Sequence, residues 1–163
     1  MPKKILFIVG VGRSGTTLLQ NMINSHSQVA FIPEINFTRR FLFNSELKNY
    51  YKRGYKYLRS FIENDKWLSR LDSKIIDKIN FDKTSDDNFS IHVYEQILLA
   101  NCNIQKKSIG GDKDPRSIEI VDKIENYISN IHWIHIIRDP RDVIVSKQKA
   151  GWSKNTSIIK HII

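Results

Sequence analysis

Apolar residues near the start of the chain predict a strand, a helix and a second strand in close succession. The run from Ile5 to Val9 is continuous and rich in β-branched residues, which is typical of a strand buried on both faces of a parallel sheet. From about residue 16 to residue 27 the apolar spacing becomes helical. The residues expected to face the first strand are Leu18, Leu19, Met22, Ile23 and His26. Residues 29–32 then predict a short second strand, which Pro33 ends.

Later segments extend this pattern. Residues from about 36 to 101 combine helical apolar spacing with crowded tyrosines, lysines and arginines, and we interpret them as a helical insertion after the second strand. Within it, the polar segment 82–88 predicts a loop. An amphipathic helix is expected near residues 118–128, and residues 132–137 predict a further buried strand. The sequence therefore predicts an α/β fold with a central parallel sheet flanked by helices, in one domain spanning residues 1–163.

Composition and charge narrow the class of ligand. The chain of 163 residues has a hydrophobic fraction of 40% and a formal net charge of +9, which favours an anionic ligand or surface. Cys102 is the only cysteine, so an intrachain disulfide is impossible and a secreted scaffold is not expected. The lysines before Ile5 imitate a signal peptide, but Arg13 interrupts the apolar stretch and no cleavage site follows. We therefore expect a cytoplasmic protein without a transmembrane segment.

Aromatic and basic residues alternate in the insertion, which raises the question of nucleic-acid binding. Such residues can stack on bases and neutralise phosphates, but they can equally pack on a helix face. The residues concerned are Tyr50, Tyr51, Tyr55, Tyr57 and Trp67, with Lys52, Arg53, Lys56 and Arg59 between them. Because no recognised nucleic-acid-reading motif accompanies them, we expect structural or acceptor-lining roles and no nucleic-acid partner.

The first predicted strand ends in a glycine-rich turn that leads into hydroxyl residues. Gly10, Gly12 and Gly15 permit positive φ angles and close approach to the backbone. Thr16 and Thr17 begin the helix, whose free N–H groups and positive dipole end face the turn. This arrangement predicts an anion-binding site.

The same turn satisfies two phosphate-binding patterns. Read as Gly10-x-Gly12-x-x-Gly15 it matches the dinucleotide fingerprint, and Glu34 lies near the offset expected for a ribose-binding carboxylate. Read as a nucleotide-triphosphate P-loop it lacks the lysine, whose position Thr16 occupies. Such a loop can cradle a 5′-phosphate but is poorly equipped for γ-phosphoryl transfer, and Arg13 supplies a cation instead. A dinucleotide-binding domain and a kinase are both alternatives at this point.

Two later segments share a Lys/Arg-Asp-Pro-Arg pattern, at residues 113–116 and 138–141. An aspartate N-cap followed by proline starts a helix, so Lys113 and Arg138 are expected in strand-to-helix turns on the same sheet edge as the glycine loop. Ser146, two turns into the last helix, can add a hydroxyl to the ligand of Arg138. The alternative is that each pattern only begins a helix.

The histidines do not suggest a metal site. His132 and His135 are three residues apart on a predicted strand, so they project to opposite faces. We expect them in the core or at an interface, and we expect no metal ligand.

These motifs together resemble the sulfotransferase family. The resemblance rests on the GxxRSGTT loop, the Pro-Glu after the second strand, Lys-Asp-Pro, and IIRDPRDVIVS, and it extends from residue 10 to residue 146. It implies a P-loop-type three-layer fold related to that of P-loop kinases. It also implies 3′-phosphoadenosine 5′-phosphosulfate as co-substrate and an acceptor hydroxyl as its partner.

The resemblance assigns roles to individual residues. It implies that the loop wraps the 5′-phosphosulfate and that Arg138 and Ser146 hold the 3′-phosphate. The loop residues concerned are Arg13, Ser14, Gly15, Thr16 and Thr17. Glu34 and Lys113 look most like the catalytic pair of the tyrosylprotein sulfotransferase branch, as base and charge stabiliser, with Arg13 also stabilising the leaving group.

Members of this family usually continue beyond the point where this sequence ends, with a loop that covers the adenine. We therefore expect either a fragment or a product lacking that lid, and a relative that binds nucleotide without catalysis is an alternative. The acceptor, whether phenol, glycan or lipid, and the oligomeric state are not predicted by the sequence.

Overall fold

Four parallel strands form the centre of the molecule. The computed structural model describes residues 2, 4–81 and 88–151. The strands are β1 (Lys4–Gly10), β2 (Val29–Phe31), β3 (Ile109–Lys113) and β4 (Ile131–Ile136), in the order β2-β3-β1-β4. All three pairings are parallel, so the carboxyl ends of the strands meet at one edge of the sheet. The predicted α/β fold with a central parallel sheet is confirmed.

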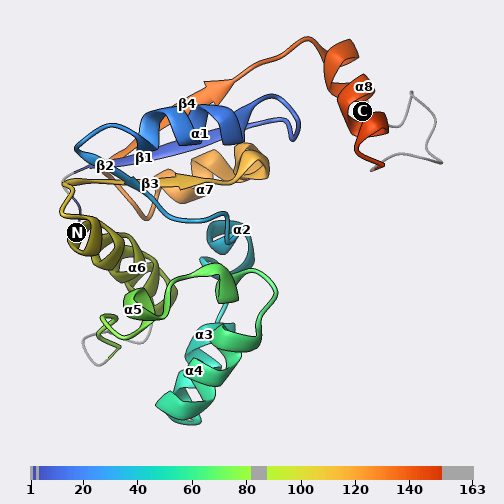
Figure 1. The fold of residues 1–163 in the computed structure, drawn as a ribbon. Helices are drawn as coiled ribbons and strands as arrows, with labels where there is room; N and C mark the ends of the chain where they lie inside the picture. Colours follow the sequence, from blue (N-terminus) through green and yellow to red (C-terminus); the bar gives the residue numbers. More distant parts are fainter. Residues whose placement is uncertain (1, 3, 82–87, 152–163) are drawn as a thin grey trace.

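Helices cover both faces of this sheet (Figure 1). Alternate residues of β1 face opposite layers: Ile5 and Phe7 join the core cluster that includes α6 (Phe89–Gln105) and α7 (Val121–Glu125). Ile8 joins a smaller cluster with residues of α1 (Thr16–Asn24). The first strand is therefore buried on both faces, as its continuous apolar run predicts.

The segment between β2 and β3 is helical, which confirms the predicted insertion. Its elements are α2 (Phe37–Phe41), α3 (Glu46–Lys52), α4 (Tyr55–Asn64), the 3₁₀ helix η1 (Leu68–Arg70), α5 (Ser73–Ile76) and α6. Aromatic rings hold it together: Tyr50 stacks on Phe61 with ring centroids 4.2 Å apart, and Tyr51 stacks on Phe89 at 5.1 Å. The structural role expected for Tyr50 and Tyr51 is thus confirmed. The predicted loop at 82–88 lies, except for residue 88, outside the described residues.

The first helix is shorter and less buried than its apolar pattern predicts. It ends at Asn24, and Leu18 and Met22 are 67% and 64% exposed. Only Leu19 and Ile23 of its apolar residues pack against the strands, because one narrow stripe of α1 contacts the sheet. The prediction that all five residues face the first strand is wrong.

The last strand also differs from its prediction. Residues 132–137 predict a buried strand, but β4 is the edge strand of the described sheet, and His132 and His135 are both exposed. A strand with a neighbour on one side only is less completely covered, so the expected core position of these histidines is wrong.

The two Asp-Pro segments begin helices in different ways. Asp139 accepts a hydrogen bond from the Arg141 N–H at 2.9 Å and caps α8 (Pro140–Lys149), as predicted. Asp114 makes no such cap, and the 3₁₀ helix η3 (Pro115–Ile120) precedes α7 in place of one continuous amphipathic helix. No helix among the described residues is long and apolar enough to cross a membrane.

Close packing of β2 on β3 leads to a prediction about Gly111. A Cβ atom at this position would lie 2.6 Å from the ring of Phe31. Gly111→Ala is therefore expected to lower the free energy of unfolding by about 1–3 kcal/mol, measured by urea denaturation. In a Phe31→Leu background the cost of Gly111→Ala should be smaller, since the clashing ring is gone. An equal cost in both backgrounds would contradict this explanation.

Candidate active site

The loop between β1 and α1 has the backbone geometry of an anion-binding turn. Gly10 has φ +148°, and a Cβ there would lie 2.5 Å from the carbonyl oxygen of Ile136 on β4. Gly15 has φ +97° and precedes the first residue of α1, which no side chain caps. The uncapped N–H groups of the first turn are therefore available to an anion at the carboxyl edge of the sheet.

Arg13, Arg138 and Ser146 form one group of side chains at this edge. The Nε of Arg13 donates a hydrogen bond to the Ser146 Oγ at 3.2 Å. The guanidinium of Arg138 donates to the carbonyl oxygen of Arg13, also at 3.2 Å. The structure thus brings together the glycine loop and the later Arg-Ser pair, which are more than a hundred residues apart in the sequence.

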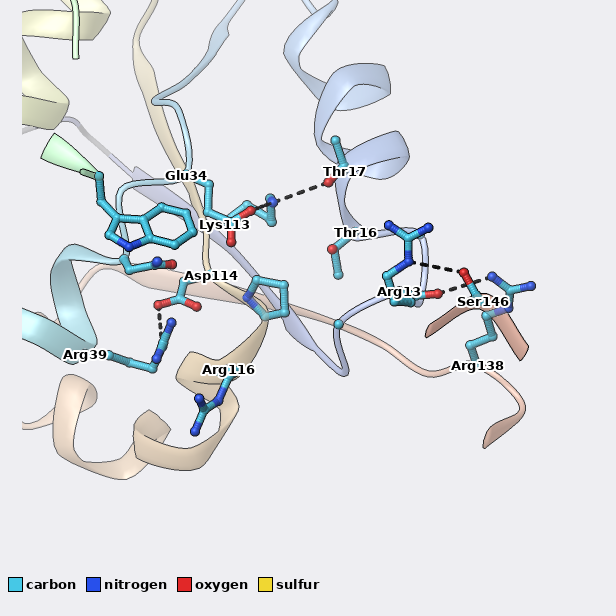
Figure 2. A pocket seen from close by; sticks show the side chains of 15 residues that line it. Arg13, Thr16, Thr17, Glu34, Arg39, Lys113, Asp114, Arg116, Arg138 and Ser146 are labelled. Atoms are coloured by element: carbon cyan, nitrogen blue, oxygen red, sulfur yellow. Dashed lines mark hydrogen bonds and ion pairs between the residues drawn. The ribbon is translucent and has the colours of Figure 1, made fainter. Parts of the chain in front are cut away.

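Glu34, Lys113 and Thr17 form a second group (Figure 2). The Lys113 Nζ donates a hydrogen bond to the Thr17 Oγ1 at 3.3 Å and forms an ion pair with the Glu34 carboxylate. Because β3 lies between β2 and β1, the residue that ends β3 can reach both neighbours. The Lys113 side chain is only 3% exposed, so its charge needs such partners.

Two aspartates flank Lys113, and both are buried. Asp114 pairs with Arg39, whose Nε lies 2.7 Å from the Asp114 Oδ2. Arg39, which belongs to α2, thus holds one oxygen of a carboxylate that was expected to cap the following helix. Asp112 accepts hydrogen bonds from the Tyr94 hydroxyl at 2.9 Å and from the Lys113 N–H at 2.7 Å. The backbone that carries Lys113 is therefore held on both sides.

Burial changes the acidity of Asp112. Loss of hydration, and secondly the nearby Asp114 carboxylate, raise the pKa of Asp112 to about 7. The same burial raises the pKa of the Tyr94 phenol above its usual range.

A cavity of about 540 Å³ contains both groups. This volume lies within the range of ligand-binding pockets. The predicted site residues that line the cavity are Arg13, Gly15, Thr16, Thr17, Glu34, Lys113, Arg138 and Ser146. Five basic and two acidic side chains are present in its lining, so the cavity suits an anion.

One predicted binding residue does not line the cavity. Ser14 is buried, and its Oγ has no hydrogen-bond partner within the described part of the chain. Arg13 lines the cavity at the glycine loop. It contacts Ser146 and Arg138, and Figure 2 shows it apart from the pair of Glu34 and Lys113.

The structure adds residues that the sequence did not single out. Asn36 and Arg39, directly after the second strand, line the same cavity as Glu34. Trp67 from the insertion also lines it. The position of Asn36 and Arg39 in the sequence could have identified them, because residues just beyond the carboxyl end of a parallel strand face the ligand crevice.

Comparison with known proteins agrees with these observations. A family model described as the sulfotransferase family matches residues 6–161. No curated protein matches the chain. The match includes the glycine loop, both Asp-Pro segments and the helical insertion.

The raised pKa of Asp112 predicts how stability depends on pH. The folded protein keeps this proton up to about pH 7, whereas the unfolded chain releases it near the ordinary value of 3.8. The free energy of unfolding should therefore fall as the pH rises from 4 to 7, by a total of about 4 kcal/mol from this group. Asp112→Asn should remove this contribution. The difference in the free energy of unfolding between the variant and the parent should therefore change between pH 4 and pH 7.

Chemical denaturation of both proteins at several pH values measures this difference. Asp142→Asn, which alters an exposed carboxylate, serves as the control and should leave the pH dependence unchanged. A constant difference between Asp112→Asn and the parent from pH 4 to 8 would contradict the assignment.

Proposed function

The chain belongs to the sulfotransferase family, and we propose that it transfers a sulfuryl group from 3′-phosphoadenosine 5′-phosphosulfate to an acceptor hydroxyl. The observation that carries this proposal is the position of Lys113. Its ammonium contacts Thr17 of the glycine loop and Glu34 after β2, so one cation joins the proposed phosphosulfate site to the proposed base.

The nucleotide is proposed to lie along the two groups of basic residues. The 5′-phosphosulfate occupies the glycine loop, where N–H groups of residues 13–17 and the Lys113 ammonium surround it. Arg138 and Ser146 bind the 3′-phosphate. Arg13 lies between these sites, since it contacts Ser146 through its side chain and belongs to the loop through its backbone.

In the proposed reaction, the acceptor oxygen attacks sulfur in line with the bond to the 5′-phosphate. A bond from that oxygen to sulfur forms, the bond from sulfur to the bridging oxygen breaks, and 3′-phosphoadenosine 5′-phosphate leaves. Glu34 takes the acceptor's proton as general base. Negative charge grows on the leaving phosphate, and Lys113 and the loop N–H groups stabilise it there.

Two observations favour this function over the alternatives. A dinucleotide site would use a carboxylate after the second strand to bind ribose, but Glu34 is ion-paired with Lys113. A nucleotide-triphosphate kinase would carry lysine where this loop has Thr16.

Nucleotide binding provides the first test. We expect calorimetry to show tighter binding of 3′-phosphoadenosine 5′-phosphate than of ATP with magnesium, NAD or NADP. Arg138→Ala should weaken binding of this nucleotide by about 2–3 kcal/mol, because a charge-assisted contact is lost. Binding of adenosine 5′-phosphosulfate, which lacks the 3′-phosphate, should change little.

Arg141→Ala is the matched control, since Arg141 belongs to the same Asp-Pro segment but is exposed and pairs with Asp139. It should leave both affinities unchanged. Equal losses for the two nucleotides in Arg138→Ala would mean that Arg138 has a structural role only. Tightest binding of ATP or NAD would contradict the proposed function.

The second test concerns the proposed base. Glu34→Gln should retain nucleotide binding but lower the rate of sulfate transfer by about 10²–10⁴-fold, because a general base contributes on that order. Lys113→Ala should lower turnover with a smaller loss of nucleotide affinity, since the leaving charge develops mainly in the transition state. The measurement is transfer of labelled sulfate, with Glu63→Gln on the exposed face of α4 as control. Transfer by Glu34→Gln at the parent's rate would remove Glu34 from the mechanism.

A further inference from the structure

The cavity extends beyond the proposed catalytic pair, on the side away from the nucleotide loop. Figure 2 shows Arg39, Asp114 and Arg116 on one side of Glu34 and Lys113, and Arg13, Arg138 and Ser146 on the other. Asn36 and Trp67 also line the cavity. We refer to the part lined by Asn36, Arg39, Trp67, Asp114 and Arg116 as the acceptor end.

The cations of the acceptor end already have carboxylate partners. Arg39 pairs with Asp114 at 2.7 Å, and Arg116 pairs with Glu119 at 2.9 Å. Each of the two arginines that line this end of the cavity is therefore paired with a carboxylate. At the nucleotide loop, Arg13 hydrogen-bonds to the Ser146 hydroxyl. Arg138 hydrogen-bonds to the Arg13 carbonyl oxygen and also lies 3.7 Å from the Asp142 carboxylate.

Two buried oxygen atoms at the acceptor end lack a hydrogen-bond donor. The Oδ1 atoms of Asn36 and Asp114 have no partner among the described residues, although the two residues are only 6% and 1% exposed. Buried acceptors without partners are costly, so such atoms point to a ligand that supplies donors. Hydroxyl groups supply donors, whereas carboxylate and sulfate groups supply none.

Asn36 is held in an unusual backbone conformation. It has φ 52° and ψ 30°, in the left-handed region, directly before α2 and two residues after Glu34. Asparagine tolerates this conformation better than most residues. Asn36 therefore keeps a defined backbone position in the lining of the cavity, close in sequence to the proposed base.

Trp67 gives the acceptor end one aromatic wall. It is the only aromatic side chain among the described residues that line the cavity. The guanidinium of Arg70 lies 4.1 Å from the centroid of the Trp67 ring and donates a hydrogen bond to the Glu34 carbonyl oxygen at 3.1 Å. The Asp65 carboxylate accepts a hydrogen bond from the backbone N–H of Trp67 at 2.9 Å. Arg70 therefore connects the Trp67 ring to the backbone of the proposed base.

This combination distinguishes between classes of acceptor. A lipid chain or a small phenol is best held by several apolar walls, which the acceptor end does not have. An acidic peptide or glycan needs unpaired cations, but Arg39 and Arg116 are paired. An uncharged sugar offers hydroxyl donors for the lone oxygen atoms and a C–H face that stacks on the negative face of an indole ring.

We infer that the acceptor is an uncharged glycan, whose sugar ring lies on Trp67 and whose hydroxyl beside the reacting one donates to Asn36. This inference rests on the proposed sulfotransferase function and names its substrate class. The reacting hydroxyl forms the new bond to sulfur, its proton passes to Glu34, and 3′-phosphoadenosine 5′-phosphate leaves.

The test compares matched acceptors in a transfer assay with labelled 3′-phosphoadenosine 5′-phosphosulfate. The acceptors are a neutral disaccharide, the same disaccharide with a uronic acid, a tyrosine peptide with acidic neighbours, and a long-chain alcohol. The neutral disaccharide should have a kcat/KM at least tenfold above each of the others.

Two variants connect this preference to the acceptor end. Asn36→Gly keeps the left-handed backbone, because glycine adopts it freely, and removes only the amide. It should raise KM for the neutral disaccharide about tenfold with little change in kcat. Trp67→Leu should do the same, whereas Trp67→Phe should have a smaller effect because an aromatic face remains. Trp133→Phe, on β4 outside the cavity, is the control.

Preference for the acidic peptide, the uronate or the alcohol would overturn the inference, as would an unchanged KM in both Asn36→Gly and Trp67→Leu. Failure of the proposed function is recognised separately, by calorimetry with 3′-phosphoadenosine 5′-phosphate. Ligand-observed NMR with the neutral disaccharide tests the sugar site without any transfer. Binding that Trp67→Leu weakens supports the inference, and absence of binding to the nucleotide-loaded parent contradicts it.

Discussion

The buried ion pair between Lys113 and Glu34 is the interaction on which the arrangement of the site depends. A lysine whose side chain is 3% exposed keeps its charge only if nearby groups replace the hydration of its ammonium. Glu34 follows β2 and Thr17 follows β1, so both partners are within reach only because β3 lies between these two strands. The position of the Lys113 ammonium therefore depends on the strand order, as the packing of the core does.

The same pair lies between the two ends of the cavity. Arg13 and Arg138 lie at the glycine loop, where Arg13 contacts Ser146 and Arg138 contacts the Arg13 carbonyl oxygen and the Asp142 carboxylate. Beyond Glu34, Arg39 is neutralised by Asp114. In the proposed reaction, the nucleotide at the glycine loop and the acceptor at the other end share one cavity, with Lys113 at the point where they meet.

Much of this arrangement is predictable from the sequence because it depends on local chemistry. The run from Ile5 to Val9, the glycine turn and the Asp139 cap are each determined by residues close in the sequence. Predictions failed where a distant residue decides the outcome. Asp114 was expected to cap a helix, but one of its oxygens pairs with Arg39, which is distant in the sequence. Leu18 and the edge strand β4 are exposed because few other elements pack against them in the fold. The spacing of apolar residues in the sequence does not show how many elements will pack against a segment.

The position of the nucleotide tests the central claim most directly. A crystal structure of the protein with 3′-phosphoadenosine 5′-phosphate is predicted to show the 5′-phosphate on the N–H groups of the glycine loop, with Lys113 beside it. The 3′-phosphate should lie against Arg138 and Ser146, and the space between Glu34 and Trp67 should stay open for the acceptor. A nucleotide bound in the reverse orientation, or with its 5′-phosphate away from Lys113, would contradict this account.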